Sequence, residues 1–563
     1  MRTSMKAFRQ SEATRSKVNA KQVLVWSFSF LLFVFVILVL RMPVISQGHD
    51  WDPGAYAYVA KRLLQGQELY TDVWDHKGPV MFFMNSIGLF LWDLRYEGII
   101  LFQGMLLCAT CLISFRYLSY YFGATASLLA TLFLLFGLTL QSGNFPEEYN
   151  LFFQSLSLLL FTLSIRKRCS KRENIILFAA IGALAALSFF TRQNMIGLWF
   201  VIGLYLLFKI VTDPGKRKRS YVALASMGMG FAAIAAIVLV LMSNQWSEYI
   251  EATWTFNLTS TNVDHSWTPF NRQPAKSLMY WVPLSWFAFV GFPIVVIKFL
   301  HFSRSFNPLS LVIVWAPLEL FLASINRQYH GHYNLQMLLP MQIIIACLFY
   351  ILFLAAMRLF KKEKSLVSVS TSSRKNKRRM FGIQSIKTVI SASSIFIIFL
   401  VLRQPDANAL SNAFLPLNSQ RLQKTVDRLL YQQRNMFEYR FFVENSRPLL
   451  PYIKQTLSPD QTVLILGDSG YVHFYSNRHP PIRQFYFYHI DRAGTRLGGR
   501  YARELLQAIE RADASMIVVD IPMWNSSILM NHAATKHAIN GALIRSYELD
   551  RVFGGKYVYL KKN

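Results

Sequence analysis

Long apolar runs separated by short polar segments dominate the chain from residue 23 to about residue 403. A transmembrane helix needs about 20 mostly apolar residues to cross roughly 30 Å of hydrocarbon. The runs that approach or reach this length are 23–40, 97–116, 123–141, 148–165, 174–190, 195–211, 221–242, 277–298, 309–325, 334–357 and 384–403. The pattern therefore predicts a polytopic α-helical membrane protein with about 11 transmembrane helices.

The charged residues decide between two explanations of the net charge of +29. A nucleic-acid-binding protein would carry its basic residues on one folded surface, whereas a membrane protein collects them in short cytoplasmic loops. Here they lie in short blocks between apolar runs, at 166–172, 216–219, 298–304 and 358–379. The first 22 residues also hold six basic side chains and one acid. We therefore predict no nucleic-acid partner, and a cytoplasmic N-terminal tail at residues 1–22.

One apolar segment, Gly78–Trp92, makes the topology ambiguous. Counted as a span, it would place the basic blocks outside the cell, and it is shorter than a full crossing. Treated as a juxtamembrane segment, it leaves every basic block inside. We expect the second arrangement, with a long first outer loop at residues 41–96 inside a transmembrane domain at 23–403.

The last part of the chain, 404–563, has a different pattern. Helix-like spacing at Arg421–Phe437 precedes two short apolar runs, Thr462–Leu466 and Ser515–Val519, each typical of a buried strand. An odd number of spans places this part on the outer face. The pattern predicts an extracytoplasmic α/β domain.

The first outer loop gathers side chains suited to group transfer. Asp50 and Asp52 follow the first span, and Asp75, His76 and Lys77 come later in the same loop. A carboxylate can act as general base towards an acceptor hydroxyl, while a cation stabilises a departing phosphate. A loop whose charges only keep it hydrated would have the same composition, so the composition alone leaves both explanations open.

The spacing of the loop resembles a known family. The pattern Asp52-Pro-Gly-Ala-Tyr56, followed by Trp74-Asp75-His76-Lys77-Gly78-Pro79, is similar to the first outer loop of GT-C glycosyltransferases. The bacterial members related to protein O-mannosyltransferases and lipid A aminoarabinose transferases are the most similar. In that family an Asp, often followed by Glu, precedes a Lys-Pro-Pro. Here Pro53 replaces the Glu and Gly78 replaces a proline.

The resemblance implies the roles of several residues. The family transfers sugars from polyprenyl-phosphate donors, with its catalytic Asp at Asp52 and its phosphate-contacting Lys at Lys77; Asp50 is the alternative base. Further candidates for donor or phosphate binding are Tyr56, His76, Glu147, Glu148, Arg192, His330, His332 and Tyr333. Some relatives bind a divalent metal between the first loop and a later His, for which Asp75, His76 and His330 are the candidates. No other cofactor is expected.

Some of these residues have simpler explanations. Glu147 and Glu148 would favour the dipole at a helix N-terminus, and Arg192 would reach lipid headgroups. Glu319 lies inside a predicted span, where an acid is either functional or satisfied by a polar partner.

Together these features predict an inverting glycosyltransferase at the outer face of the cytoplasmic membrane, acting on a lipid, glycan or protein acceptor. The alternative is a polytopic lipid or sugar transporter or flippase, which would show internal repeats and charged or broken helices near the midplane.

Overall fold

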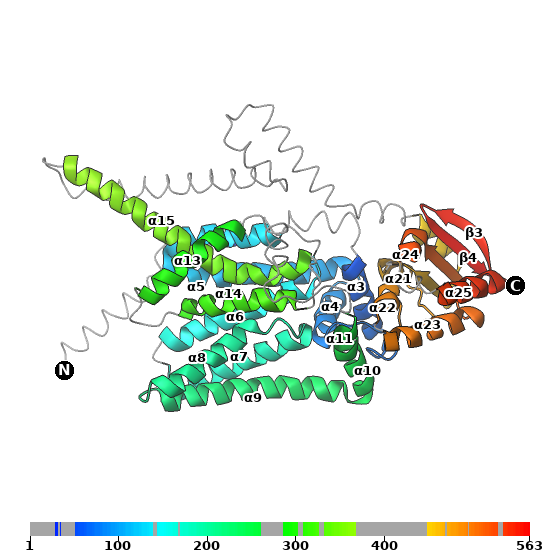
Figure 1. The fold of residues 1–563 in the computed structure, drawn as a ribbon, viewed down its shortest axis with the longest axis horizontal. Helices are drawn as coiled ribbons and strands as arrows, with labels where there is room; N and C mark the ends of the chain where they lie inside the picture. Colours follow the sequence, from blue (N-terminus) through cyan, green and yellow to red (C-terminus); the bar gives the residue numbers. More distant parts are fainter. Residues whose placement is uncertain are drawn as a thin grey trace.

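The computed structural model of the chain contains a helical bundle, a small α/β domain, and short helices between them (Figure 1). It describes residues 51–138, 143–166, 169–260, 285–301, 308–325, 331–367, 448–467, 470–493, 495–526 and 533–562, with five positions between residues 27 and 34. Most of the predicted span 23–40, all of 384–403 and the predicted helix Arg421–Phe437 lie outside the described residues, so the count of eleven spans stays a prediction.

The helices of the bundle follow the predicted spans closely. They are α5 (Tyr96–Leu138), α6 (Pro146–Arg166), α7 (Lys171–Thr191), α8 (Gly197–Thr212), α9 (Arg217–Leu241), α13 (Ser285–His301), α14 (Val312–Ser324) and α15 (Leu338–Val367). Among the described residues, stretches of α5, α7, α9 and α15 are long and apolar enough to cross a membrane. The predicted spans 97–116 and 123–141 correspond to two helices that share the label α5 and meet at a kink at Gly123, where φ is 74°.

Helix α9 lies along the edge of the bundle (Figure 1) and shows which surface meets lipid. Only 17% of its most apolar window is buried inside the protein. Met229, Ile237 and Val240 are among its exposed side chains. The exposed apolar side chains of this helix favour hydrocarbon over water. Hydrocarbon is a suitable environment because a helix satisfies its backbone polar groups internally.

Two short helices of the first outer loop lie between the bundle and the α/β domain. Helix α3 (Trp51–Leu64) carries Asp52 in its first turn, where an acid favours the helix dipole. Helix α4 (Pro79–Leu91) covers the ambiguous apolar segment. Its 13 residues span about 20 Å, too short to cross a bilayer.

A segment of short helices follows α9 and packs against the first loop. It consists of η1 (Ser243–Gln245), α10 (Trp246–Ile250), the π-helical turn η2 (Glu251–Phe256) and α11 (Asn257–Thr259). The Asn257 side-chain amide donates a hydrogen bond to the carbonyl oxygen of His76 at 3.1 Å, and Phe256 packs edge-on against Trp74. The backbone around His76 is therefore held from the bundle side.

The α/β domain is a four-stranded mixed sheet in the order β1-β2-β4-β3. The predicted strands are confirmed as β1 (Val463–Leu466) and β2 (Met516–Asp520), which are parallel. The sequence interpretation missed β3 (Tyr547–Phe553) and β4 (Lys556–Lys561), an antiparallel hairpin closed by Gly554 and Gly555. The helices are α20 (Leu449–Thr456), α21 (Gly470–Ser476), α22 (Phe487–Arg492), α23 (Thr495–Glu510), α24 (Ile521–Ser526) and α25 (Ala533–Ser546).

The α/β domain packs directly on α3 through α21. A Cβ atom added to Gly54 would lie 2.9 Å from Tyr471, and one added to Gly470 would lie 2.7 Å from Ala55. The Lys61 ammonium donates to the carbonyl oxygen of Phe474 at 2.9 Å. The helix that begins beside Asp52 is thus fixed against the α/β domain.

Candidate functional site

Asp52 lies in the first turn of α3 and accepts hydrogen bonds on both carboxylate oxygens. The Tyr56 hydroxyl, one turn along the same helix, donates to Oδ2 at 3.1 Å. The Tyr486 hydroxyl, from the α/β domain, donates to Oδ1 at 3.3 Å. Asp52 is half-buried, whereas both tyrosines are buried. The predicted base is therefore a partly accessible carboxylate held from two sides.

Lys77 is buried on the same side of α3, in the turn before α4. Its ammonium bonds His76 Nε2 at 2.7 Å, and its backbone N–H donates to Asp75 Oδ1 at 2.9 Å. Burial lowers the pKa of Lys77 to about 8, helped by the charge of Arg192 and opposed by those of Asp52 and Asp75. The charges of Asp52 and Arg192 are thus close enough to act on Lys77, so the predicted base, the predicted phosphate ligand and Arg192 lie in one site.

The structure explains why glycine replaces a proline after Lys77. A Cβ atom at Gly78 would lie 2.0 Å from the carbonyl oxygen of Phe190, at the C-terminal end of α7. Any larger residue would push the loop away from this helix end. The replacement therefore allows the backbone beside Lys77 to touch the helix that ends at Arg192.

Arg192 is held by the ends of two helices. It caps the C-terminus of α7 and forms a buried ion pair with Glu147, in the first turn of α6. Both positions favour the helix dipoles, with a cation at a C-terminus and an acid at an N-terminus. The guanidinium also lies 3.9 Å from the centre of the Tyr333 ring.

The turn before α6 connects these residues to α3. The Asn144 amide donates to the carbonyl oxygen of Pro53 at 3.0 Å, next to Asp52. Glu148 accepts the backbone N–H of Phe145 at 3.2 Å, so it contributes to the helix N-terminus. His332 stacks on Phe145, with ring centres 4.4 Å apart. Glu147, Glu148 and His332 therefore surround the site as structural neighbours of Arg192 and Asp52.

A cluster of possible metal ligands lies beside Lys77. It contains Asp75, His76 and His489 of the α/β domain, with one ligand atom from each within 4.8 Å of the others. His76 Nδ1 is 3.3 Å from His489 Nε2, which is 3.6 Å from Asp75 Oδ2. Ligands of a tetrahedral zinc ion are separated by roughly 3.3–3.4 Å. The His76–His489 distance matches this value, whereas Asp75 lies 3.6 Å from His489 and 3.8 Å from His76, so the donor types fit such an ion and the carboxylate would have to move closer. The third predicted ligand, His330, and the alternative base, Asp50, lie outside the described residues.

Burial and the neighbouring charges set the protonation of this cluster. Burial lowers the pKa of His76 well below its usual value, as do Lys77, His489 and Arg192. Burial likewise lowers the pKa of His489 and raises that of Asp75 to about 7. The imidazoles are therefore neutral at neutral pH, and His76 Nε2 accepts from the Lys77 ammonium.

The sequence interpretation missed two residues that contact the site, Tyr486 and His489, and a third, Glu251, that binds the α/β domain. The first two belong to the run Phe485-Tyr486-Phe487-Tyr488-His489. Such a concentration of aromatic side chains in a predicted outer domain was a usable signal, although nothing in the run indicates its partner.

Glu319, the acid inside α14, is fully buried with polar partners. It accepts hydrogen bonds from the Trp315 indole at 2.7 Å and the Gln154 amide at 3.4 Å. These contacts agree with the explanation that a polar partner satisfies it.

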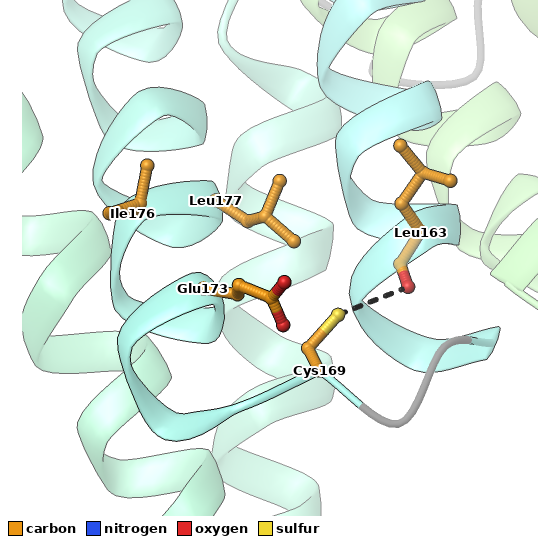
Figure 2. A pocket seen from close by; sticks show the side chains of 5 residues that line it. All are labelled: Leu163, Cys169, Glu173, Ile176 and Leu177. Atoms are coloured by element: carbon orange, nitrogen blue, oxygen red, sulfur yellow. Dashed lines mark hydrogen bonds between the residues drawn. The ribbon is translucent and has the colours of Figure 1, made fainter.

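A small surface hollow lies far from the site, at the other end of α6 and α7 (Figure 2). It is lined by Leu163, Cys169, Glu173, Ile176 and Leu177. The Glu173 carboxylate already caps α7 together with Ser170. Since α6 rises about 1.5 Å per residue, Leu163 lies roughly 24 Å along the helix from Glu147. The hollow has no connection with the predicted chemistry.

Comparison with known proteins identifies the fold. No protein-family model and no curated protein sequence matches the chain. The solved structure of ArnT from Cupriavidus metallidurans bound to undecaprenyl phosphate aligns over 94% of this chain and 97% of its own, with a TM-score of 0.60 and 14% identity. Its apo state aligns with a TM-score of 0.58 and 15% identity, over the same shares of the two chains.

A second enzyme matches more weakly. The oligosaccharyltransferase AglB from Archaeoglobus fulgidus, in complex with an inhibitory peptide and a dolichol-phosphate, aligns over 96% of this chain and 74% of its own. Its TM-score is 0.49, with 11% identity.

The chain is thus a multi-pass membrane protein whose fold resembles that of ArnT. The helical part is joined to a C-terminal mixed sheet, and the resemblance expected from the first loop is confirmed for the fold.

Proposed function

We propose that this protein is an inverting glycosyltransferase that transfers a sugar from a polyprenyl-phosphate donor to an acceptor hydroxyl. The observation that carries the proposal is the placement of Asp52, Lys77 and Arg192 in one site of an ArnT-like fold. ArnT itself has been solved with undecaprenyl phosphate bound. The site would work at the outer face of the cytoplasmic membrane, with the N-terminus inside and the α/β domain outside.

The reaction needs a base and a counter-charge on opposite sides of the anomeric carbon. Asp52 takes the proton of the acceptor hydroxyl, whose oxygen forms a bond to the anomeric carbon. The bond from that carbon to the phosphate oxygen breaks, and polyprenyl phosphate leaves with the electron pair. Lys77 offsets the charge on the departing phosphate, which a buried cation does more effectively than an exposed one.

The remaining candidates have supporting roles. Arg192, already paired with Glu147, orients the phosphate beside Lys77, and Tyr333 lies against its guanidinium. Tyr56 fixes Asp52. Asp75, His76 and His489 would hold a divalent metal if one is bound, and such an ion would supply further positive charge near the phosphate.

The proposal is tested by transfer of radiolabelled sugar from polyprenyl-phosphate hexoses in membranes that contain the protein. Asp52→Asn keeps the shape of the side chain and removes the base, so we expect a loss of at least 100-fold. Asp72→Asn is the matched control: Asp72 lies in the same loop and only accepts the backbone N–H of Glu68. Equal transfer by Asp52→Asn and wild type would exclude Asp52 as the base. Absence of transfer by wild type from every lipid-linked sugar would count against the activity itself.

A further inference from the structure

One segment of the α/β domain, residues 483–492, contacts both parts of the first-loop site. Tyr486 donates to Asp52 Oδ1, and His489 lies 3.3 Å from His76 Nδ1 and 3.6 Å from Asp75 Oδ2. The two contacts are three residues apart along the chain. Through this segment the α/β domain therefore contacts both the predicted base, Asp52, and the pair Asp75 and His76.

The hydroxyls of Tyr486 and Tyr56 hold the Asp52 carboxylate in different ways. Tyr56 belongs to α3, so it moves with Asp52, whereas Tyr486 comes from another domain and is itself buried. With a donor on each oxygen, rotation of the carboxylate about its last bond breaks at least one hydrogen bond. Each carboxylate oxygen has two lone pairs, so one remains on each for an acceptor hydroxyl. The contact orients the base without blocking it.

Arg483 anchors the start of this segment. Its carbonyl oxygen accepts the Trp74 backbone N–H at 3.1 Å, and its guanidinium donates to the carbonyl oxygen of Tyr70 at 3.3 Å. It also forms an ion pair at 3.1 Å with Glu251 of η2. The segment that carries Tyr486 is therefore attached to the first loop and to the bundle.

Glu251 makes two further contacts with the α/β domain. It accepts from the Tyr501 hydroxyl at 2.8 Å and pairs with Arg500, both on α23. Burial raises the pKa of Glu251, but the hydrogen bonds from Arg500 and Tyr501 and the nearby arginine charges outweigh it and lower the pKa below its usual value. Glu251 is thus an ionised acid shared by three side chains of the α/β domain.

We propose that Tyr486 is a positioning residue for Asp52, so that the α/β domain is part of the catalytic centre and Glu251 holds it in place. The inference rests on the proposed function and deepens it. It assigns the α/β domain a role in the chemical step, in addition to any contact with the acceptor.

The first test compares Tyr486→Phe with Tyr488→Phe in steady-state sugar transfer. Tyr488 is the matched control because it is the same residue type in the same segment, with its ring centre 5.9 Å from that of Tyr486. We expect Tyr486→Phe to lower kcat about tenfold, a fraction of the 10²–10⁴ that a general base supplies, with a nearly unchanged KM for the donor. Tyr488→Phe should retain wild-type kcat. An unchanged kcat in Tyr486→Phe, or a raised KM alone, would overturn the inference.

The second test separates positioning from misfolding. Binding of undecaprenyl phosphate and the melting temperature should match wild type in Tyr486→Phe, because only one hydroxyl is lost. A fall in kcat that comes together with lost binding of undecaprenyl phosphate would contradict a positioning role.

The third test addresses Glu251. Glu251→Gln should lower kcat in the same direction as Tyr486→Phe and increase hydrogen exchange in residues 483–492. Glu248→Gln, on the preceding helical turn, is the control: its half-buried carboxylate accepts a hydrogen bond from the Ser247 hydroxyl at 2.8 Å, so the variant should change neither. Wild-type exchange and kcat in Glu251→Gln would exclude the holding role.

The failure of the inference is distinct from that of the proposed function. If Asp52→Asn is inactive and Tyr486→Phe is fully active, the inference alone fails. If Asp52→Asn is fully active, the assignment of the base fails.

Discussion

The two cations of the site come from different regions and are held in different ways. Lys77, in the first outer loop, bonds the neutral ring of His76. Arg192, in the turn after α7, forms a buried ion pair with Glu147 and lies against Tyr333. The charge of Arg192 is therefore largely compensated before a substrate arrives, whereas among the described residues the acids that act on Lys77 are Asp52 and Asp75, neither of which bonds its ammonium.

This difference indicates how the two regions divide the work. A cation bound to a neutral acceptor keeps its full charge available to stabilise a departing phosphate. A cation in a fixed ion pair contributes geometry, because arginine presents a planar fork of donors. We expect Lys77 to determine the rate of the chemical step and Arg192 to determine stability and orientation.

The largest effect is expected for Lys77→Met, which preserves the length of the side chain and removes its charge. Loss of one preorganised electrostatic contact of this type costs about 10²–10³ in kcat. Lys77→Arg, which keeps the charge, should retain more activity than Lys77→Met. Sugar transfer measured at saturating donor checks both variants, and equal activity of Lys77→Met and wild type would refute the division of work.

The next effect concerns the stability provided by the Glu147–Arg192 pair. Removing one member of a buried pair leaves an uncompensated charge and costs roughly 3–5 kcal/mol. Glu147→Gln and Arg192→Met should therefore both lower the free energy of unfolding strongly. The double variant Glu147→Met/Arg192→Met should recover most of the loss, because neither charge remains.

Chemical denaturation in detergent measures this double-mutant cycle. Additive losses in the double variant would show that the two side chains act independently, contrary to the compensation that the structure indicates.

A smaller effect is expected where the two regions touch. Gly78→Ala would place a Cβ atom 2.0 Å from the Phe190 carbonyl oxygen, so the loop or the end of α7 must move. We expect a loss of about 1–3 kcal/mol, as for other overpacked sites, and reduced transfer because Lys77 is displaced. Gly66→Ala is a useful contrast: its φ of 85° is unfavourable to alanine, whereas the φ of Gly78 is −70°, but no atom lies within 4 Å of a Cβ added at Gly66. If Gly78→Ala retains full transfer, close contact between the two regions is unnecessary.

The sequence predicted the bundle well because lipid imposes a simple rule. A helix in hydrocarbon must satisfy all its backbone polar groups and expose apolar side chains, so each span appears as a run of the right length. The prediction 174–190 became Lys171–Thr191, and 195–211 became Gly197–Thr212. The hairpin of β3 and β4 was missed because β3 is largely exposed and carries charged residues, although Gly554-Gly555 is a recognisable turn signal.

The candidate site was predicted in its local part and, through the family resemblance, at Arg192, Glu147 and Tyr333, but its contacts with the α/β domain were not predicted. Asp52, Lys77 and their neighbours lie in one loop, and their spacing resembles that of a known family. Tyr486 lies 434 residues from Asp52, and His489 lies 413 residues from His76. Contacts at such separations depend on how two domains pack, and a single sequence carries no local periodicity that reports them.

The smallest expected effect concerns the packing of the α/β domain on α3, a helix of the same loop as Lys77. His473 of α21 is buried against Tyr58 of α3, and its Nδ1–H donates to the carbonyl oxygen of Arg478. Burial lowers the pKa of His473 to about 4, opposed by this hydrogen bond and assisted by the charges of His479 and Arg62.

The folded protein therefore keeps His473 neutral, while the unfolded chain takes up a proton near pH 6.5. The stability that His473 contributes is fully present above pH 6.5 and is lost as the pH falls towards 4. At pH 5.5, one unit below the pKa of the unfolded chain, the loss is about 1.4 kcal/mol, since one pKa unit corresponds to about that free energy. Comparison of melting temperatures at pH 7.5 and 5.5 for wild type and His473→Gln measures it, because glutamine retains a donor and does not titrate. The variant should lose less stability on acidification than wild type. An identical acid shift in wild type and His473→Gln would place the acid sensitivity elsewhere than at the contact between α21 and α3.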